Sequence, residues 1–217
     1  MAHDFEAVFE PGAMAMPDFL AGLPVLLADH RMSHTGEVFQ LVRERDGTFA
    51  VAEMATHLIA GLDELPPLLR RWHGVSIGLV SAELLARLGR CDSIEVDLRV
   101  CRTAAGIAIS YRESATAWRT RRKEPALLQE LADMLLALCL LARSSRAMYD
   151  EETAGLSTGE VAPALTHLLA TRRFPSGGMD GVVVLPEKDA ETALAQLGVS
   201  HERLISREKG LASVVLL

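Results

Sequence analysis

Two neighbouring segments of the chain show a clear alternation of apolar and polar residues. In "SIEVDLRVC" every second residue is apolar, and "IAISYR" repeats the pattern after a turn at Gly106. A period of two places one set of side chains on a buried face and the other set in solvent. The two segments therefore predict an antiparallel hairpin with one wet face. The side chains expected on its buried face are Ile94, Val96, Leu98, Val100, Ile107 and Ile109.

A second hairpin and a buried strand precede this pair. The runs "EVFQLVRE" and "TFAVAEM" flank Asp46-Gly47. Asp-Gly between two β-rich runs is the strongest short-range hairpin signal. The run "GVSIGLVS", Gly74 to Ser81, predicts a buried strand. Ser81 is then expected to cap a helix that ends at Gly89.

Three further segments predict helices. Pro17 to His30 has helical periodicity, and Pro24 is expected to kink or end that helix. A short helix from Ala55 to Leu65 is expected to stop at Pro66-Pro67. The longest helix is expected from Pro125 to about Ala147, because "MLLALCLLA" within it is apolar on all sides. That apolar run is far shorter than the roughly 20 residues that cross a bilayer. We therefore expect it to be buried in the core or in a homodimer interface.

The last part of the chain continues with a helix, a strand, a helix and two strands. They are expected at Val161 to Thr171, Val182 to Leu185, Glu187 to Leu197, His201 to Ile205 and Leu211 to Leu216. The whole order predicts an α+β fold: a mainly antiparallel sheet with helices packed on one face, one long buried helix and a C-terminal βαββ unit. The predicted domains are a main α+β domain, residues 1–173, and a C-terminal βαββ subdomain, residues 174–217, packed on it.

Composition narrows the class of protein. The chain has 217 residues, 49% of them hydrophobic, which is enough for a core without disulfide bonds. A formal net charge of −7 argues against binding to nucleic acid or to an anionic membrane over the whole surface. The three cysteines include no Cys-x-x-Cys pair, and the N-terminal stretch has no secretory pattern. We therefore expect a cytoplasmic protein with reduced thiols.

The stretch "FPSGGMDGVVVLPE", Phe174 to Glu187, contains the glycines and the serine of a phosphate-binding loop. Such a loop lies between a strand and a helix, whereas these glycines precede the strand. The helix after the strand begins with Glu187 and Asp189, whose charges would repel phosphate. The stretch is therefore interpreted as a connection rather than as a phosphate site.

Histidines and carboxylates gather in two nearby parts of the sequence. Histidine supplies general bases and metal ligands, so a ligand, metal or acid–base site is one hypothesis for this set. The alternative is that its members are polar residues at helix ends and on the surface. The set comprises Asp29, His30, His34, Glu53 and His57.

One basic segment opposes the acidic net charge. The segment "AWRTRRK" contributes Trp118, Arg119, Arg121, Arg122 and Lys123. Cations beside an aromatic ring suit an anionic ligand or a single-stranded nucleic acid. Docking of an acidic protein partner is an equally simple reading. Internal ion pairs with Glu113 and Glu124 are another.

No catalytic signature stands out, and this absence shapes the functional hypothesis. The serines form no Gly-x-Ser-x-Gly elbow, and no cysteine lies at an evidently electropositive helix start. The wet face of the hairpin, with Glu95, Asp97 and Arg99, is a candidate protein-binding face. We therefore predict a cytoplasmic protein-binding module of the adaptor, chaperone or toxin-neutralising type that acts without catalysis and without a cofactor. The alternative is a small-molecule enzyme or sensor with a histidine/carboxylate or arginine-lined pocket. The expected partner is another protein, with a homodimer as a further option.

Overall fold

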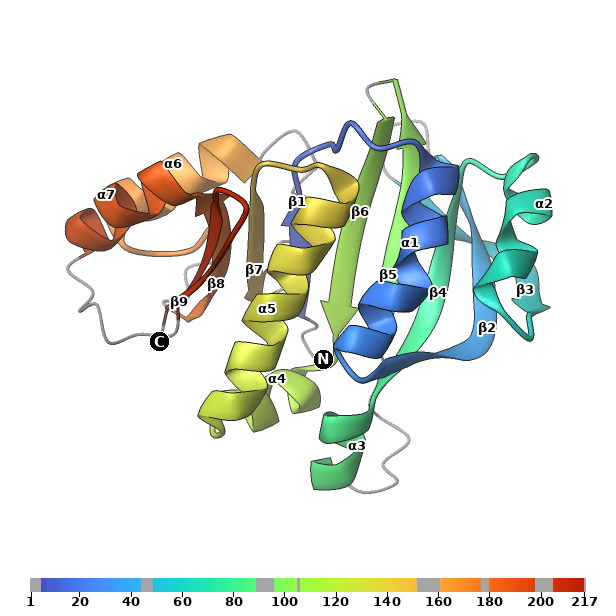
Figure 1. Ribbon diagram of the computed structural model, residues 1–217, viewed down its shortest axis with the longest axis horizontal. Coiled ribbons are helices and arrows are strands. Elements are labelled where there is room, and N and C mark those ends of the chain that lie inside the picture. The colour runs from blue at the N-terminus through green and yellow to red at the C-terminus, as the bar shows by residue number, and fades with distance from the viewer. Residues whose placement is uncertain are drawn as a thin grey trace.

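All the described strands of the computed structural model belong to a single antiparallel sheet (Figure 1). The structure describes residues 5–43, 49–88, 96–104, 106–151, 161–176, 180–197 and 205–216. Ten strands lie in the order β3-β2-β4-β5-β6-β1-β7-β8-β10-β9. They are β1 Phe5–Phe9, β2 Met32–Arg43, β3 Phe49–Leu58, β4 Gly74–Ser81, β5 Val96–Thr103, β6 Gly106–Glu113, β7 Ala147–Glu151, β8 Gly181–Pro186, β9 Ile205–Glu208 and β10 Leu211–Leu216. The predicted α+β fold with a mainly antiparallel sheet is confirmed.

The helices cover the two faces of this sheet unequally. Helices α1 and α5 lie across one face, in front of the strands in Figure 1, and α2 packs into the same core. Helices α6 and α7 pack on the opposite face, over β1, β7, β8 and β10. Helices α3 and α4 contact each other. In addition, α3 contacts β4 and α4 contacts α5. The bounds are α1 Met16–Asp29, η1 Leu62–Glu64 (a 3-10 turn), α2 Leu65–Leu69, α3 Ala82–Leu88, α4 Ala115–Arg121, α5 Pro125–Ala142, α6 Val161–Thr171 and α7 Glu187–Leu197.

The alternating strands β5 and β6 pair as predicted, with Val96 opposite Glu113 and Val100 opposite Ile109. Their inward side chains join the main core with those of α1 and α5. This confirms the predicted burial of Val96, Leu98, Val100, Ile107 and Ile109 beneath the long helix. Ile94 lies outside the described residues.

Helix α5 is the central helix of the main core, and it is shorter than predicted. It ends at Ala142 because Arg143 adopts a left-handed conformation, with φ of 56°, and the Ser144 N–H bonds back to the Cys139 carbonyl. Residues from Ala147 onward form β7 instead. By length and composition α5 could cross a membrane, but 56% of it is buried inside the protein. Such burial is typical of a core helix.

The C-terminal strands are buried on both sides. On β8, Val182 and Val184 face the main core, whereas Val183 and Leu185 face α6 and α7. This arrangement explains why the strand is a continuous apolar run rather than an alternating one. Strands β8, β10 and β9 continue the sheet of the N-terminal part. The division into domains at residues 173 and 174 stays a prediction.

Two strands that pattern reading missed lie near the middle of the sheet. β1 is inserted between β6 and β7, and it joins the N-terminal part of the sheet to the C-terminal part. Both β1 and β7 have five residues, too few for a period to stand out. The long helix was expected to reach about Ala147, where β7 begins, and the first four residues of β7 are buried.

Three local expectations about helices need correction. Pro24 does not end the expected helix, since α1 continues beyond it to Asp29. The helix expected from Ala55 is wrong, because pairing with β2 extends β3 to Leu58. Pro66-Pro67 begin α2 rather than stop a helix, because the first turn of a helix needs no N–H partners.

Candidate functional site

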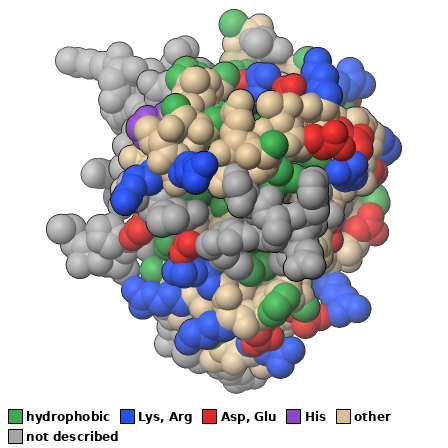
Figure 2. All heavy atoms as spheres, turned by 90° about the vertical axis from the view of Figure 1, so that its left-hand side faces the viewer, with side chains coloured by type: hydrophobic (Ala, Val, Ile, Leu, Met, Phe, Trp, Pro, Cys, Tyr) green, Lys and Arg blue, Asp and Glu red, His purple; other side chains and the backbone are tan. Residues whose placement is uncertain are grey.

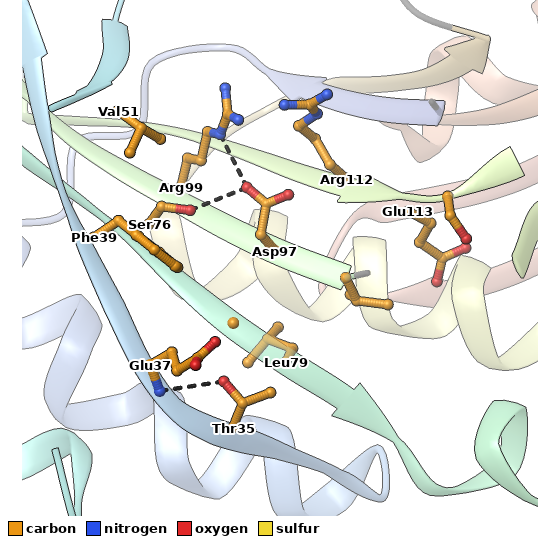
Figure 3. Close-up of a pocket in the computed structure, with 13 residues that line it drawn as sticks. Thr35, Glu37, Phe39, Val51, Ser76, Leu79, Asp97, Arg99, Arg112 and Glu113 are labelled. Atoms are coloured by element: carbon orange, nitrogen blue, oxygen red, sulfur yellow. Dashed lines mark hydrogen bonds and ion pairs between the residues drawn. The ribbon is translucent and has the colours of Figure 1, made fainter. Parts of the chain in front are cut away.

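Part of the sheet has a face over which no described helix lies. We call it the open face, and it is the side of β2, β4, β5 and β6 opposite to α1 and α5. It contains a hollow of about 370 Å³ (Figure 3). The side chains and glycine that form the open face around this hollow are Thr35, Glu37, Phe39, Val51, Ser76, Gly78, Asp97, Arg99 and Arg112.

The sequence of β4 explains why a hollow forms on a sheet surface. Large side chains at Val75, Ile77 and Leu79 are buried on the core side. On the open face, β4 presents Ser76 and Gly78, which are too small to fill the space between β2 and β5. A Cβ atom at Gly78 would lie only 2.5 Å from Thr35 Oγ1. Small residues at alternate positions of one strand therefore set the floor of the hollow.

The walls of the hollow come from the neighbouring strands. Phe39 of β2 pairs with Ser76 on one side, and Arg99 of β5 pairs with it on the other. Val51 of β3 lies at the outer margin and is 41% exposed. The hollow thus has an aromatic wall and a cationic wall facing each other across a floor of small residues (Figure 3).

Asp97 orients the cationic wall. The Ser76 hydroxyl donates to Asp97 Oδ2 at 3.1 Å, and Arg99 Nε donates to the same oxygen at 2.9 Å. Because Nε is bound to Asp97, the terminal nitrogens of Arg99 point away from that carboxylate (Figure 3). The two side chains are about one quarter exposed, at 27% for Asp97 and 23% for Arg99. This pair is held in place, yet solvent and ligands can reach it.

Charged residues on four neighbouring strands, from β5 to β7, form one row across the sheet. The register places Asp97 opposite Arg112, Arg112 opposite Glu6, and Glu6 opposite Asp150. Burial raises the pKa of Glu6, although Ser110 and Arg112 oppose the shift. Burial also raises the pKa of Asp150, whose carboxylate accepts hydrogen bonds from the Ser176 hydroxyl and N–H. The row therefore passes from the open face into the part of the sheet that α6 and α7 cover.

Two of the predicted basic-segment residues do not belong to any surface. Trp118 is buried, with its ring 5.1 Å from that of Phe5 and 5.2 Å from that of Tyr149. Arg121 is also buried, and its Nε and Nη2 donate to the Glu113 carboxylate at 2.8–3.0 Å. The predicted internal ion pair with Glu113 is the reading that fits here. These two residues are buried because they lie on the side of α4 that packs against the core.

Neighbouring groups form hydrogen bonds with both members of the buried ion pair of Glu113 and Arg121. The hydroxyls of Tyr111 and Tyr149 donate to Glu113, and Arg121 Nη1 donates to the Leu127 carbonyl at 2.9 Å. Burial disfavours the Arg121 cation, but the Glu113 carboxylate outweighs that effect and raises the pKa of the guanidinium. Burial and the same carboxylate raise the pKa of both tyrosines. The two tyrosines therefore stay protonated and Arg121 stays charged at neutral pH, and we interpret the network as structural.

The remaining basic residues are dispersed. Arg119, Arg122 and Lys123 are exposed. Arg122 forms an ion pair with Asp180 at 2.5 Å. Glu124 pairs with Arg87 of α3 at 3.1 Å rather than with Arg121. The segment therefore offers exposed cations on α4 and after it, without the predicted aromatic ring beside them.

The histidines and carboxylates predicted as one site are not brought together. Asp29 and His30 line a second hollow, of about 520 Å³, between α1, α3 and α5. Burial lowers the pKa of His30 there. His34 instead accepts the Gly36 N–H through Nδ1. His57 packs on Trp72, with ring centroids 4.8 Å apart.

The Glu53 side chain lies outside the described residues. Within the described part of the chain, no three His, Cys, Asp or Glu side chains are placed to hold a metal ion. The second hollow is rich in carboxylates, but two of them are already paired: Glu83 with Arg31 at 2.5 Å and Glu124 with Arg87.

The C-terminal side of the protein shows intermixed charges rather than a field of one sign. Figure 2, which faces the left-hand side of Figure 1, shows cationic and anionic side chains side by side. Arg207 pairs with Glu187 at 3.1 Å, and Lys209 pairs with Glu208 at 3.3 Å. Charge on this side is locally balanced, which does not favour a polyanion.

Sequence reasoning found part of the open face. Asp97 and Arg99 lie on it as the wet residues of β5, and Glu95 lies outside the described residues. Phe39 and Ser76 were not identified, and Arg112 was noted only as a cation preceding the basic segment. The segment "GVSIGLVS" was predicted only as a buried strand, although its alternation of small and large residues is a signal that could have indicated the floor of a hollow. Phe39 and Arg112 became site residues only through strand pairing.

Comparisons with known proteins identify no family. No family model matches the chain, and no curated protein matches it significantly. A solved structure with a partly similar arrangement is the 1.75 Å crystal structure of the toxic C-terminal tip of CdiA from Pseudomonas aeruginosa in complex with immune protein. The match covers 72% of this chain and 90% of that chain, with 14% identity and a TM-score of 0.38. A likeness this low carries no argument about function.

Proposed function

We propose that the protein acts by binding another protein through its open face. The observation that carries this proposal is the hollow between Phe39 and Arg99 on a sheet face that no described helix covers. Aromatic residues and arginine are enriched at the centres of protein interfaces. The side chain of Arg99 is already oriented by Asp97, so less conformational entropy is lost when a partner binds.

The surroundings of the hollow also suit a protein partner. Exposed Glu37 and half-buried Arg112 give a polar rim, while Val51 and Phe39 supply apolar contact area. Such a mixture of an apolar centre and a polar rim is typical of interfaces between separately folded proteins. An adaptor, a chaperone or a toxin-neutralising protein would each use such a face. A cytoplasmic location remains part of this proposal.

A second candidate function is binding of a small anionic molecule in the same hollow. Arg99 and Arg112 extend to the same side of Asp97 in Figure 3, as in an arginine-lined pocket. The volume of about 370 Å³ is at the low end of the roughly 300–1,000 Å³ of ligand pockets. We rank this function second because the carboxylates of Asp97 and Glu37 line the same hollow.

The first experiment is native mass spectrometry of the protein purified gently from its own host. A second protein at fixed stoichiometry is expected. Its affinity should then fall at least about tenfold in Arg99→Glu, because the variant places a carboxylate beside Asp97. Lys188→Glu is the matched control, since this exposed residue of α7 undergoes the same charge change away from the open face.

Three outcomes would contradict the proposal. Equal partner affinity for Arg99→Glu, Phe39→Ala and the wild type would show that the open face is not the binding surface. A small retained mass without a protein partner would favour the anionic ligand. A symmetric dimer of this chain alone would favour the homodimer.

A further inference from the structure

We infer that the exposed edge of β3 accepts an extended segment of the partner protein as an additional strand of the sheet. This inference rests on the proposed function and specifies how the partner binds. It starts from the two edges of the sheet, which differ in length and in charge. An edge strand offers unpaired backbone N–H and C=O groups, and proteins protect such edges when pairing is not wanted.

The β9 edge has features that protect it against pairing with another strand. It has four residues, "ISRE", two of which are charged. Arg207 of β9 forms ion pairs with Glu187 and Glu191 of α7, at 3.1 and 3.6 Å. A short, charged strand with side chains engaged by a helix is a poor template for a further strand.

The β3 edge lacks most of these devices. It has ten residues, "FAVAEMATHL", with Glu53 as its one charged residue and no proline or lysine. Among the described residues, β3 has a neighbouring strand on one side only, namely β2. A register irregularity divides it between Val51 and Thr56. We therefore expect the partner to pair along the regular segment that includes Thr56 and Leu58.

The hydrogen-bond pattern places the free groups of this segment outward. The Ile59 N–H donates to the Gly36 carbonyl of β2 at 2.8 Å. In an antiparallel pair, bonded and non-bonded residues alternate, so His57 also bonds inward. Thr56 and Leu58 then direct their N–H and C=O groups away from β2. These four groups match those of a strand laid alongside.

Side chains of β3 on both sides of the register irregularity define the partner chemistry. Leu58 is 79% exposed and Val51 41% exposed, so two of the four exposed large hydrophobics described in the chain lie on β3. Leu58 pairs with Glu37 of β2, and Thr56 pairs with Phe39. Both pairs lie on the side of the open face, because Phe39 and Glu37 belong to it, so this face reaches the edge strand at Thr56 and Leu58. A partner strand with apolar residues toward Leu58 would extend the binding surface from the hollow to this edge.

Charge favours a foreign partner over a second copy of the chain. Glu37 is exposed beside Leu58, and the chain carries a formal net charge of −7. Two copies joined edge to edge would bring like charges together, whereas a segment with a lysine or arginine near Glu37 would gain attraction. The occupant is therefore an apolar strand with a basic residue, from another protein.

Amide hydrogen exchange of the chain in its native complex with the co-purifying protein tests this inference. The amides of Thr56 and Leu58 should exchange at least about tenfold more slowly in the complex than in the free chain. Thr56→Pro removes one outward N–H without removing a bond to β2, and it should weaken binding at least about tenfold. Thr56→Ala, which keeps the N–H, is the matched control and should bind as the wild type does. If the proline variant unfolds, Leu58→Lys replaces it.

The outcomes separate this inference from the proposed function. A complex that depends on Arg99 but leaves Thr56 and Leu58 exchanging freely would overturn the added strand and keep the open face as the binding surface. Protection of both amides in the free chain at high concentration, together with a dimer in sedimentation, would identify a second copy as the occupant and overturn the choice of partner. Absence of any protein complex would overturn both.

Discussion

The two parts of the sheet differ in how many of their faces are covered. β8 and β10 lie between α5 on one side and α6 and α7 on the other, and nearly every residue of these strands is buried. β4 and β5 have α1 and α5 on one side and the open face on the other. The comparison teaches that one continuous sheet can form a closed core at one end and leave one face without a covering helix, among the described residues, at the other.

Ion pairs show the same difference at the scale of single residues. Glu113 and Arg121 are enclosed on the core side of β6, with side chains 0% and 1% exposed. Asp97 and Arg99 face outward from β5 and are about one quarter exposed. The first pair joins β6 to α4 in the core, whereas the second pair stays accessible to solvent.

Removing the buried charge should give the largest change in stability. Glu113→Gln leaves the Arg121 cation in the core without its counter-ion, so the free energy of unfolding should fall by about 3–5 kcal/mol. Asp97→Asn, the corresponding change in the exposed pair, should alter it by less than about 1 kcal/mol. Urea unfolding of both variants measures the difference. Equal losses would show that the two pairs have the same structural role.

A matched pair of valine truncations tests the two faces directly. Val183 is 2% exposed beneath α6 and α7, and Val51 is 41% exposed at the margin of the open face. Val183→Ala should reduce the free energy of unfolding by about 2 kcal/mol, through lost apolar burial and a cavity. Val51→Ala should change it by less than about 0.5 kcal/mol. A similar cost at both sites in thermal or urea unfolding would mean that the open face is covered in solution.

Glu6 lies where the two parts of the sheet meet, and it should make stability depend on pH. Burial raises its pKa in the folded state above the ordinary value of 4.5, so the folded state binds this proton more tightly than the unfolded state does. Its contribution is therefore full below pH 4.5 and is lost as the pH rises through the folded pKa. Glu6→Gln should be more stable than the wild type at pH 7, and the difference should shrink toward pH 4.5. A difference that stays constant over this range would contradict the shifted pKa.

The smallest expected effect concerns the chemical reactivity of the Cys101 thiol, at the end of the open face away from the hollow. Leu41, Cys101 and Ala108 form a small buried cluster there, and burial raises the pKa of the Cys101 thiol to about 12. Because the thiolate is the reactive form, Cys101 should react very slowly with a disulfide reagent at pH 8. The assay uses Cys91→Ala, so that Cys101 and Cys139 are the remaining thiols. Rapid reaction of one thiol before unfolding would mean that this end is open as well.

The pattern of apolar and polar residues predicted the strands whose two faces differ, but it did not predict which strands are their neighbours in the sheet. The alternation in β5 predicted both its core side and its wet side, including Asp97 and Arg99. The apolar runs of β8 and β10 predicted buried strands. For the basic segment the sequence left a surface and an internal ion pair as alternatives, and the internal pair with Glu113 holds for Arg121, because the side that α4 turns inward depends on what packs against it.

The sequence by itself determined the strand periods, most helix positions and the small residues of β4 that leave space for a hollow. Those features are local, because they follow from side-chain size and from the repeat of a strand or helix. Only the tertiary structure decided that β1 lies between β6 and β7, that Glu113 meets Arg121, and that Phe39 faces Arg99 across Ser76. These contacts join residues far apart in the chain, and strand order depends on long-range pairing that no local pattern encodes.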